Sequence, residues 1–320
     1  MARAAEHDRL LSRVAVMYHR QGLRQAEIAR KLEISQPQVS RLLEEAQMRG
    51  IIQVSINIPE GLQFDLEEQL ENTYGLRDAH IVDVSADDDQ IVVQELGQFL
   101  AHYLPTYLKD ATVIGFTSWS RSLRETISSL PAAEQRSSVH VVEMLGDVGP
   151  PIVQHEAASQ TQALAHLLGG EAHYLRVPGV AQSKRIRNSY LERDQYARDA
   201  LELLNSVDVA LSGIGSCEVV APLIAGDNFF TDEQFEMARR KGAVGQVNLR
   251  FIDAQGLPVA TGLDEMVIGV TLDQLRNAKR KVSVAGGGSK FEAIRAALRG
   301  GWVDTIVTDT HTAHRLIENP

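Results

Sequence analysis

A glycine-rich loop near the C-terminus has the residue types that bind an anion. The apolar residues Val284 and Ala285 run into three glycines, and Ser289 and Lys290 then open a helical pattern. Glycines let backbone N–H groups approach a ligand closely, and a helix N-terminus favours negative charge. The spacing is neither a Walker A loop nor the dinucleotide fingerprint, so it does not imply a nucleotide. We therefore predict a phosphate site; the alternative is a tight turn with a surface lysine. The predicted contacts are Gly287, Gly288, Ser289 and Lys290.

A second loop, residues 117–121, also follows a strand pattern and precedes a helical one. Hydroxyl groups, an indole and a guanidinium in one loop suit a polyol or a phosphate, although each hydroxyl could instead cap a helix. Its predicted ligand contacts are Thr117, Ser118, Trp119 and Arg121. The third candidate is residues 241–246, which end on Gln246 and lead into residues 250–253, and residues 211–216 form a weaker fourth.

Residues 24–50 carry chemistry of another kind. Two short helical patterns meet at a tight break, Ser35 suits the N-cap of the second, and Gly50 suits its end. This pattern is typical of a helix-turn-helix, whose second helix enters the DNA major groove. Gln can pair with adenine and Arg with guanine, while a pair of ordinary core helices is the alternative. The predicted DNA contacts on the outer face are Ser35, Gln36, Gln38, Ser40 and Arg41.

The elements that must position these loops alternate between strand and helix after residue 80. Several predicted strands are almost continuously apolar, which suits a parallel sheet covered on both faces. Strands are predicted over 80–84, 111–116, 139–145, 172–177, 207–213, 246–252, 266–270, 281–285 and 303–308. Helices are predicted over 7–21, 62–74, 87–108, 120–130, 155–168, 188–204, 231–241, 271–278, 289–299 and 310–317. The fold class is therefore α/β, with an N-terminal helix-turn-helix domain followed by a three-layer domain with a mostly parallel sheet. Ligands of such sheets bind beyond the carboxyl ends of the strands.

The chain of 320 residues is longer than one average domain, and we expect residues 1–58 to bind DNA and residues 59–320 to bind an effector and to oligomerise. Net charge supports this division. Residues 1–50 hold nine Lys and Arg against six Asp and Glu, whereas the rest of the chain carries a net charge of −13. Residues 51–58 alternate in polarity and predict either a wing beside the recognition helix or a linking strand.

Other classes of protein are disfavoured by composition. The single cysteine, Cys217, excludes an internal disulfide, and the histidines are scattered, so we expect no metal and no cofactor. No apolar run of 18 residues and no signal-peptide core appear, so we expect a cytoplasmic protein without a membrane partner.

The motifs in their order along the whole chain resemble the SorC family of bacterial sugar-responsive transcription regulators. The likeness rests on the glycine loops at 213–215 and 242–245, on residues 250–253 and 285–290, and on Thr308-Asp309. It implies a body similar to sugar-phosphate isomerases and glucosamine-phosphate deaminases, used as a sensor of sugar phosphates or polyols. It also implies homo-oligomers, dimers or tetramers, that bind double-stranded operator DNA.

Carried over by position, the resemblance places a phosphate between the loop at 287–290 and the hydroxyls of Thr117 and Ser118. Gln246 stands where relatives often carry an acidic residue that bonds sugar hydroxyls, and Ser120 stands where they often carry glycine. Arg24 replaces a common capping Ser or Thr, and we expect it, with Gln25, to contact DNA phosphates.

An enzyme, a sugar-phosphate isomerase or deaminase with an accessory head, is the alternative function. Such chemistry needs a positioned acid and base. Asp147, Asp264 and Glu265 are loop carboxylates that could serve, and turnover would separate the two hypotheses. Whether the regulator activates or represses, which operator it binds and which effector controls it stay open.

Overall fold

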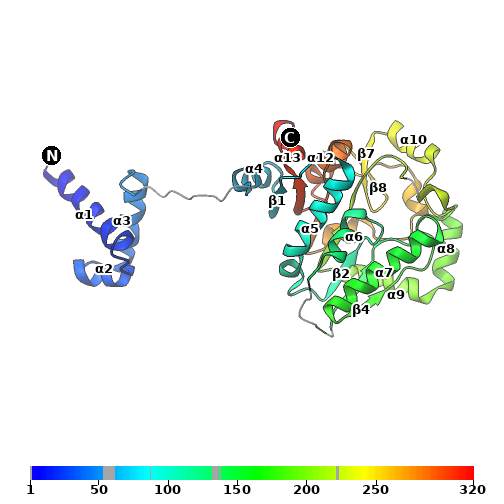
Figure 1. Cartoon of the computed structure of the whole chain (residues 1–320), viewed down its shortest axis with the longest axis horizontal. Coiled ribbons are helices and arrows are strands. Elements are labelled where there is room, and N and C mark those ends of the chain that lie inside the picture. Colours follow the sequence, from blue (N-terminus) through cyan, green and yellow to red (C-terminus); the bar gives the residue numbers. More distant parts are fainter. Residues whose placement is uncertain (1, 53–61, 87, 132–135, 137, 221–222) are drawn as a thin grey trace. The chain divides into compact units, whose positions relative to one another are not determined.

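The computed structural model describes residues 2–52, 62–86, 88–131, 136, 138–220 and 223–320 (Figure 1). The chain divides into two compact units, residues 1–59 and 60–320, called here the head and the body. The predicted strand at 51–58 lies outside the described residues except for Ile51 and Ile52, which form a bend.

The head consists of three helices, α1 (Ala2–His19), α2 (Gln25–Leu32) and α3 (Gln36–Met48). Apolar residues at helical spacing on all three helices form one small core. Ile34 packs against this core at the corner between α2 and α3, and Glu33 turns the chain there in the left-handed conformation with a φ of 55°. The core residues are Leu11, Val14, Met17, Ile28, Ala29, Val39, Leu42, Leu43 and Ala46.

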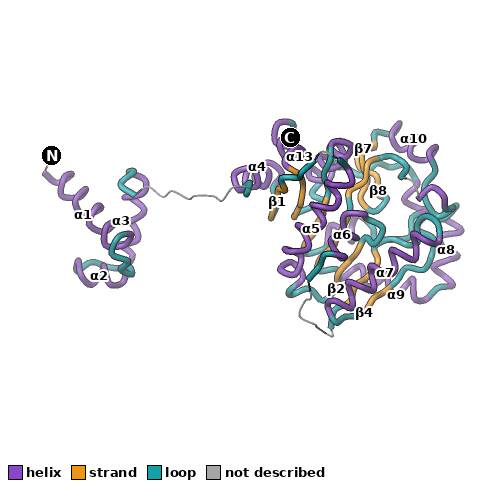
Figure 2. Tube along the Cα trace, in the orientation of Figure 1, coloured by secondary structure: helices purple, strands orange, loops and turns teal. Residues whose placement is uncertain are grey.

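The body is built on seven strands that all pair in parallel. Figure 2 draws the strands of the body in orange, with purple helices around them. Their order across the sheet is β1-β10-β9-β5-β2-β3-β4. The strands are β1 (Asp78–Val82), β2 (Val113–Phe116), β3 (His140–Glu143), β4 (Glu171–His173), β5 (Val209–Ser212), β9 (Arg280–Val284) and β10 (Thr305–Asp309). Central strands such as β2 and β5 are buried at every position, which is why their sequences do not alternate.

Helices cover both faces of this sheet, and the predicted three-layer α/β fold is confirmed. Helices α5 (Asp89–Leu108), α6 (Arg121–Ser128) and α7 (Pro151–Leu168) share one apolar core with the strands. The second core, on the other face, contains residues of α4 (Phe64–Tyr74), α9 (Gln195–Leu203), α11 (Leu272–Asn277), α12 (Phe291–Arg299) and α13 (Thr310–Glu318).

A second, antiparallel sheet of three strands stands beyond the carboxyl end of β5. It consists of β6 (Ile214–Ser216), β7 (Ala243–Val247) and β8 (Arg250–Asp253), in that order, and α10 (Asp232–Arg240) packs on β7. The single strand predicted over 246–252 is therefore wrong. The chain reverses at Asn248 and Leu249, which have φ values of 49° and 60°, and positive φ at both central residues is the geometry of a tight hairpin turn.

Two other predicted elements differ from the structure. The helix predicted over 188–204 is two helices, α8 (Lys184–Arg193) and α9, because the extended Asp194 ends the first and caps the second. The strand predicted over 266–270 is absent from the described chain. Its residues follow a 3-10 helix, Leu263–Met266, and make only isolated bridges through Val267 and Gly269.

Candidate DNA-binding and effector-binding sites

Three loops meet at the carboxyl edge of the parallel sheet because β9, β5 and β2 are neighbours in it. Residues 117–120 follow β2, Gly213 follows β5, and residues 285–287 follow β9. Parallel strands end at the same edge, so loops that are far apart in sequence are brought together here. All three loops are ligand candidates predicted from the sequence, and the order of the strands in the sheet explains why they adjoin.

A cavity of about 170 Å³ lies between these loops. Of the predicted effector contacts, Trp119, Arg121, Gln246 and Lys290 line it; Thr117, Ser118, Gly287, Gly288 and Ser289 do not. The remaining wall comes from the β6 segment, from α7 and from residues before α10. Ser120 and residues 213–216, which belong to two of the predicted loops, also line the cavity, and the lining residues that sequence reasoning did not single out are Arg124, Val153, Glu156, Val220 and Leu223.

The cavity has an excess of positive charge. Arg124 is paired with Glu156 at 2.7 Å, whereas Arg121 and Lys290 form no ion pair within the described residues. Burial, and then the charge of Arg121, lowers the pKa of Lys290 below its ordinary value, while Asp89 opposes this shift. Two cations that repel each other in a partly buried space are stabilised by an anion placed between them.

Gln246 presents an amide to the cavity from the antiparallel sheet. Its Oε1 accepts the N–H of Leu249 at 2.8 Å, which fixes the side chain across the turn of the β7–β8 hairpin. Its Nε2 lies over Gly215, and no acceptor for it is found in the described part of the chain. The amide nitrogen is therefore a free donor at the cavity wall.

Thr117 and Ser118 are buried, with exposed fractions of 1% and 4%. The hydroxyl of Thr117 donates to Oδ1 of Asn248 at 2.7 Å and so ties the β2 loop to the β7–β8 hairpin. This contact gives Thr117 a structural role that the sequence pattern alone did not reveal.

The glycine loop makes an internal anion contact of its own. The N–H of Gly287 donates to the carboxylate of Asp309 at 2.8 Å and lies 3.2 Å from the hydroxyl of Thr312. Gly288 and Ser289 are exposed, and their N–H groups make no hydrogen bond to any described residue. An anion at this loop would therefore meet the amides of Gly288 and Ser289, because that of Gly287 is already occupied.

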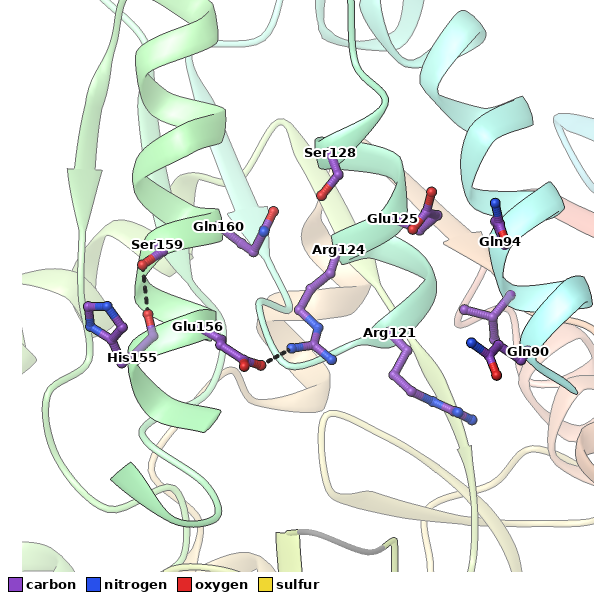
Figure 3. Close-up of a pocket in the computed structure, with 11 residues that line it drawn as sticks. Gln90, Gln94, Arg121, Arg124, Glu125, Ser128, His155, Glu156, Ser159 and Gln160 are labelled. Atoms are coloured by element: carbon purple, nitrogen blue, oxygen red, sulfur yellow. Dashed lines mark hydrogen bonds and ion pairs between the residues drawn. The ribbon is translucent and has the colours of Figure 1, made fainter. Parts of the chain in front are cut away.

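A second hollow, of about 520 Å³, adjoins the first. Figure 3 shows it between α5, α6 and α7, with Gln90 and Gln94 on α5, Arg121 and Arg124 on α6, and His155 and Glu156 on α7. Arg121, Arg124 and Glu156 line both hollows, so these three side chains form the wall between them.

The three carboxylates considered for acid–base catalysis contact basic side chains outside the cavity. Asp147 pairs with Arg176 at 3.0 Å, Glu265 pairs with Lys184 at 2.7 Å, and Asp264 accepts from Arg250 at 3.5 Å. None of the three lines the cavity.

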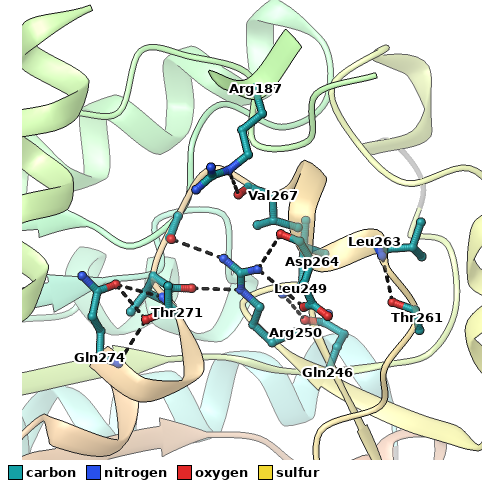
Figure 4. Close-up of polar contacts among 12 residues, drawn as sticks. Arg187, Gln246, Leu249, Arg250, Thr261, Leu263, Asp264, Val267, Thr271 and Gln274 are labelled. Carbon is teal, nitrogen blue, oxygen red and sulfur yellow. Dashed lines mark hydrogen bonds and ion pairs between the residues drawn. The ribbon is translucent and has the colours of Figure 1, made fainter. Parts of the chain in front are cut away.

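Arg250, at the start of β8, is a structural clamp. It is 6% exposed, and it donates to the carbonyl oxygens of Val270 and Asp264 at 3.0 Å each. Figure 4 shows its guanidinium at the centre of these contacts, with Arg187 donating to Val267 nearby. Arg250 thereby fixes the segment at 264–270, which contains the strand predicted over 266–270.

In the head, the start of α3 is held by a reciprocal cap. The N–H of Gln38 donates to the hydroxyl of Ser35, and the N–H of Ser35 donates to Oε1 of Gln38, both at 3.3 Å. Pro37 lies in the first turn, where a missing N–H costs little. The side chain of Gln38 is thus engaged by the cap.

The other predicted DNA contacts differ in whether their side chains already form hydrogen bonds within the head. Gln36 and Arg41 are exposed and form no side-chain hydrogen bond to any described residue, whereas the hydroxyl of Ser40 donates to Glu44 at 3.3 Å. Arg24 precedes α2, and its N–H donates to Glu27 at 2.7 Å; its side chain is exposed, while that of Gln25 is partly buried. Gln36 and Arg41 are therefore the freest candidates for base contacts.

Comparison with known proteins was made by sequence family, by sequence and by structure. The family described as "Putative sugar-binding domain" matches residues 60–318. The sorbitol operon regulator of Klebsiella pneumoniae is 30% identical over 319 residues, covering 97% of this chain and 98% of that protein. The deoxyribonucleoside regulator of Bacillus subtilis (strain 168) is 29% identical over 314 residues, covering 98% and 99%.

The crystal structure of the full-length sorbitol operon regulator of Klebsiella pneumoniae has a similar fold. It aligns with a TM-score of 0.71 at 27% identity, over 97% of this chain and 98% of that one. The likeness therefore includes the head as well as the body. No helix in the described part of the chain has the length and apolar character needed to span a bilayer.

Proposed function

This chain belongs to the SorC family of sugar-binding transcriptional regulators, and we propose that its body binds a phosphorylated sugar or polyol that controls operator binding by its head. The relatives compared above are named as a sorbitol operon regulator and a deoxyribonucleoside regulator. We infer regulation of carbohydrate or polyol metabolism in the bacterial cytoplasm.

The observation that carries the effector class is the pair of unpaired cations at the cavity. Arg121 and Lys290 supply positive charge and form no ion pair with any residue that the structure describes, and a phosphate takes several hydrogen bonds from such groups. The amides of Gly288 and Ser289 add to this field beside Lys290. A neutral sugar would leave the two cations uncompensated.

The rest of the cavity suits a small, hydroxylated carbon chain. Gln246 and Ser120 are polar groups available to hydroxyls, while Trp119 and Ile214 offer apolar surface. The volume of about 170 Å³ is below the range of roughly 300–1,000 Å³ usual for drug-sized ligands, which favours a small metabolite.

The enzyme hypothesis has no support in this geometry. Asp147, Asp264 and Glu265 are each ion-paired and lie outside the cavity, and Glu156, which lines it, is paired with Arg124. No carboxylate of the described chain is therefore placed as a free base beside a bound sugar.

Calorimetry with sugar phosphates and their unphosphorylated parents tests the effector class. We expect a phosphorylated compound to bind wild type with at least about tenfold higher affinity than its parent. Lys290→Ala should abolish most of this preference, whereas Lys184→Ala removes a lysine paired with Glu265 outside the cavity and should not. If a neutral sugar binds tightly and Lys290→Ala does not change its affinity, the proposed phosphorylated effector is wrong, whereas the function as a regulator is unaffected.

We also propose that the chain acts as a dimer or tetramer. Two heads reading two half-sites double the small surface that one helix-turn-helix buries on DNA. The body offers apolar side chains beside its edge strand β1: Leu62, Phe64 and Tyr103 are 45%, 52% and 39% exposed. Light scattering at micromolar protein should give at least twice the chain mass of 35.2 kDa; a monomer with and without DNA would contradict this.

A further inference from the structure

Away from the effector cavity, three side chains of the described chain gather into the donor set of a transition-metal site: His140, Glu171 and His173. His140 begins β3, and Glu171 and His173 are the two ends of β4, the edge strand. In the parallel register His140 pairs with Glu171, and Val142 pairs with His173. Because alternate residues of a strand point to one face, the three side chains emerge together on one face of the sheet.

The distances between the donor atoms match those around a metal ion. Nδ1 of His140 lies 2.9 Å from Nε2 of His173, and each nitrogen lies 3.9 Å from Oε2 of Glu171. In a triangle with these sides, one point is equidistant from all three atoms at about 2.1 Å, which is the length of zinc–nitrogen and zinc–oxygen bonds. That point lies in the plane of the three atoms, so a tetrahedral ion needs these side chains to rotate until the donor atoms are about 3.4 Å apart, while both strands keep their places.

We propose that His140, Glu171 and His173 bind a divalent transition metal of the zinc type, with water completing the coordination. Two imidazoles and one carboxylate suit zinc, whereas magnesium and calcium prefer oxygen ligands alone. The side chain of Glu171 is 71% exposed and that of His140 is 39% exposed, so the ion is reached from solvent and exchanges freely. It would join the edge strand β4 to β3 and stabilise the folded body.

A hydrogen bond between the two histidines is the simpler account of their closeness. One ring can donate to the other at 2.9 Å, and this contact needs no carboxylate. The role of Glu171 separates the two accounts, because only the metal site uses it.

The experiment is a zinc titration of tag-free, chelator-treated full chain, with cobalt(II) absorption as a spectroscopic probe of the coordination sphere. We expect one zinc per chain, a tetrahedral cobalt spectrum and a zinc-dependent rise in melting temperature. Glu171→Gln should weaken zinc binding about 10–100-fold, and His173→Gln should abolish it. His155→Gln, which removes an exposed histidine of α7 outside the cluster, should change nothing.

Zinc binding that saturates only at millimolar concentration, or that is equally tight in Glu171→Gln, would overturn the proposal. Should His173→Gln fail to fold, the exposed Glu171→Gln still decides. None of these readouts depends on DNA or on the effector, so a failure here leaves the proposed function untouched.

Discussion

The side-chain amide of Gln246 occupies the space that a Cβ on Gly215 would need. A Cβ built on Gly215 would lie 2.0 Å from Nε2 of Gln246, so β6 and β7 are matched at this pair. The absence of a side chain at 215 is what lets Gln246 lie at the wall of the cavity.

Gly215→Ala is therefore expected to push Gln246 off its position and to weaken effector binding about tenfold. The lost hydrogen bond to the N–H of Leu249 should cost about 0.5–1.5 kcal/mol of folding stability. Calorimetry and thermal melting measure the two effects. Gly115→Ala is the matched control, since its Cβ would also make a close contact, 2.7 Å from Sδ of Met144, but neither residue lines the cavity. Unchanged effector affinity in Gly215→Ala would remove Gln246 from the site.

Asp309 links the glycine loop to α13. It accepts from the N–H groups of Gly287 and Thr312 and from the hydroxyl of Thr312, at 2.7–2.8 Å, and it is 2% exposed. Asp309→Ala leaves these buried donors unpaired, and we expect a loss of about 2–4 kcal/mol in the free energy of unfolding. Asp88→Ala removes an exposed N-cap and should cost only about 1 kcal/mol. Equal losses in chemical denaturation would show that the glycine-loop contact adds nothing.

The carboxyl group of Asp147 predicts a pH dependence of stability. Burial raises its pKa to about 6, with Arg176 opposing and Glu143 adding to the shift. A folded-state pKa above the unfolded value means that the folded protein binds the proton more tightly. The free energy of unfolding therefore increases as pH falls through about 6 towards 4. At pH 7.5 the ionised carboxylate of Asp147 lowers this free energy by on the order of 1–3 kcal/mol.

Asp147→Asn should accordingly be more stable than wild type at pH 7.5, and the gap should close as pH falls to about 4. The difference in unfolding free energy between the two proteins, followed across this range, isolates Asp147 from other carboxylates. Glu265→Gln, an exposed control, should stay within about 0.5 kcal/mol of wild type throughout. A gap that does not vary with pH would contradict the raised pKa.

Arg41 is expected to read a base in the operator. Its exposed side chain has no partner among the described residues of the chain, so Arg41→Ala should weaken specific binding by about 1–3 kcal/mol and relax preference at one position. Gln36→Ala should act similarly. Gln38→Ala should instead destabilise the start of α3, because Gln38 is part of the cap.

Electrophoretic shift assays on operator and scrambled DNA separate these effects. Arg9→Ala removes the same charge from α1, and any loss of affinity it causes should be equal for operator and scrambled DNA. Native operator affinity in Arg41→Ala would show that the assignment of the recognition face is wrong.

Much of the architecture could be predicted because strands such as β2 and β10 contain apolar runs and each is followed directly by a helix. The β7–β8 hairpin could not be predicted from the sequence. Its turn places Asn248 and Leu249 at positive φ, and leucine rarely adopts that conformation. Polar and apolar residues alternate from Gln246 to Phe251, straight through the turn, and this alternation gave the appearance of one strand.

The cavity was predicted by its loops but not by all of its walls. Val153 and Glu156 reach it from α7, a helix whose packing against α6 no local pattern encodes. The cluster of His140, Glu171 and His173 was not predicted for the same reason. His140 is at least 31 positions from the other two in the sequence, and only the pairing of β3 with β4 brings them together.

The central claim is that an anionic effector bound at Lys290 alters the affinity of the head for operator DNA. A ligand shifts that affinity only by as much as its own affinity differs between the two states of the protein. The most direct measurement is fluorescence anisotropy of labelled operator, titrated with protein at fixed concentrations of each sugar phosphate and its neutral parent. We predict that one phosphorylated compound changes the operator Kd at least about fivefold, the lower end of usual allosteric coupling, and that Lys290→Ala loses this change while keeping its basal Kd. An equal change in Lys290→Ala, or a change produced only by the neutral parent, would contradict the account.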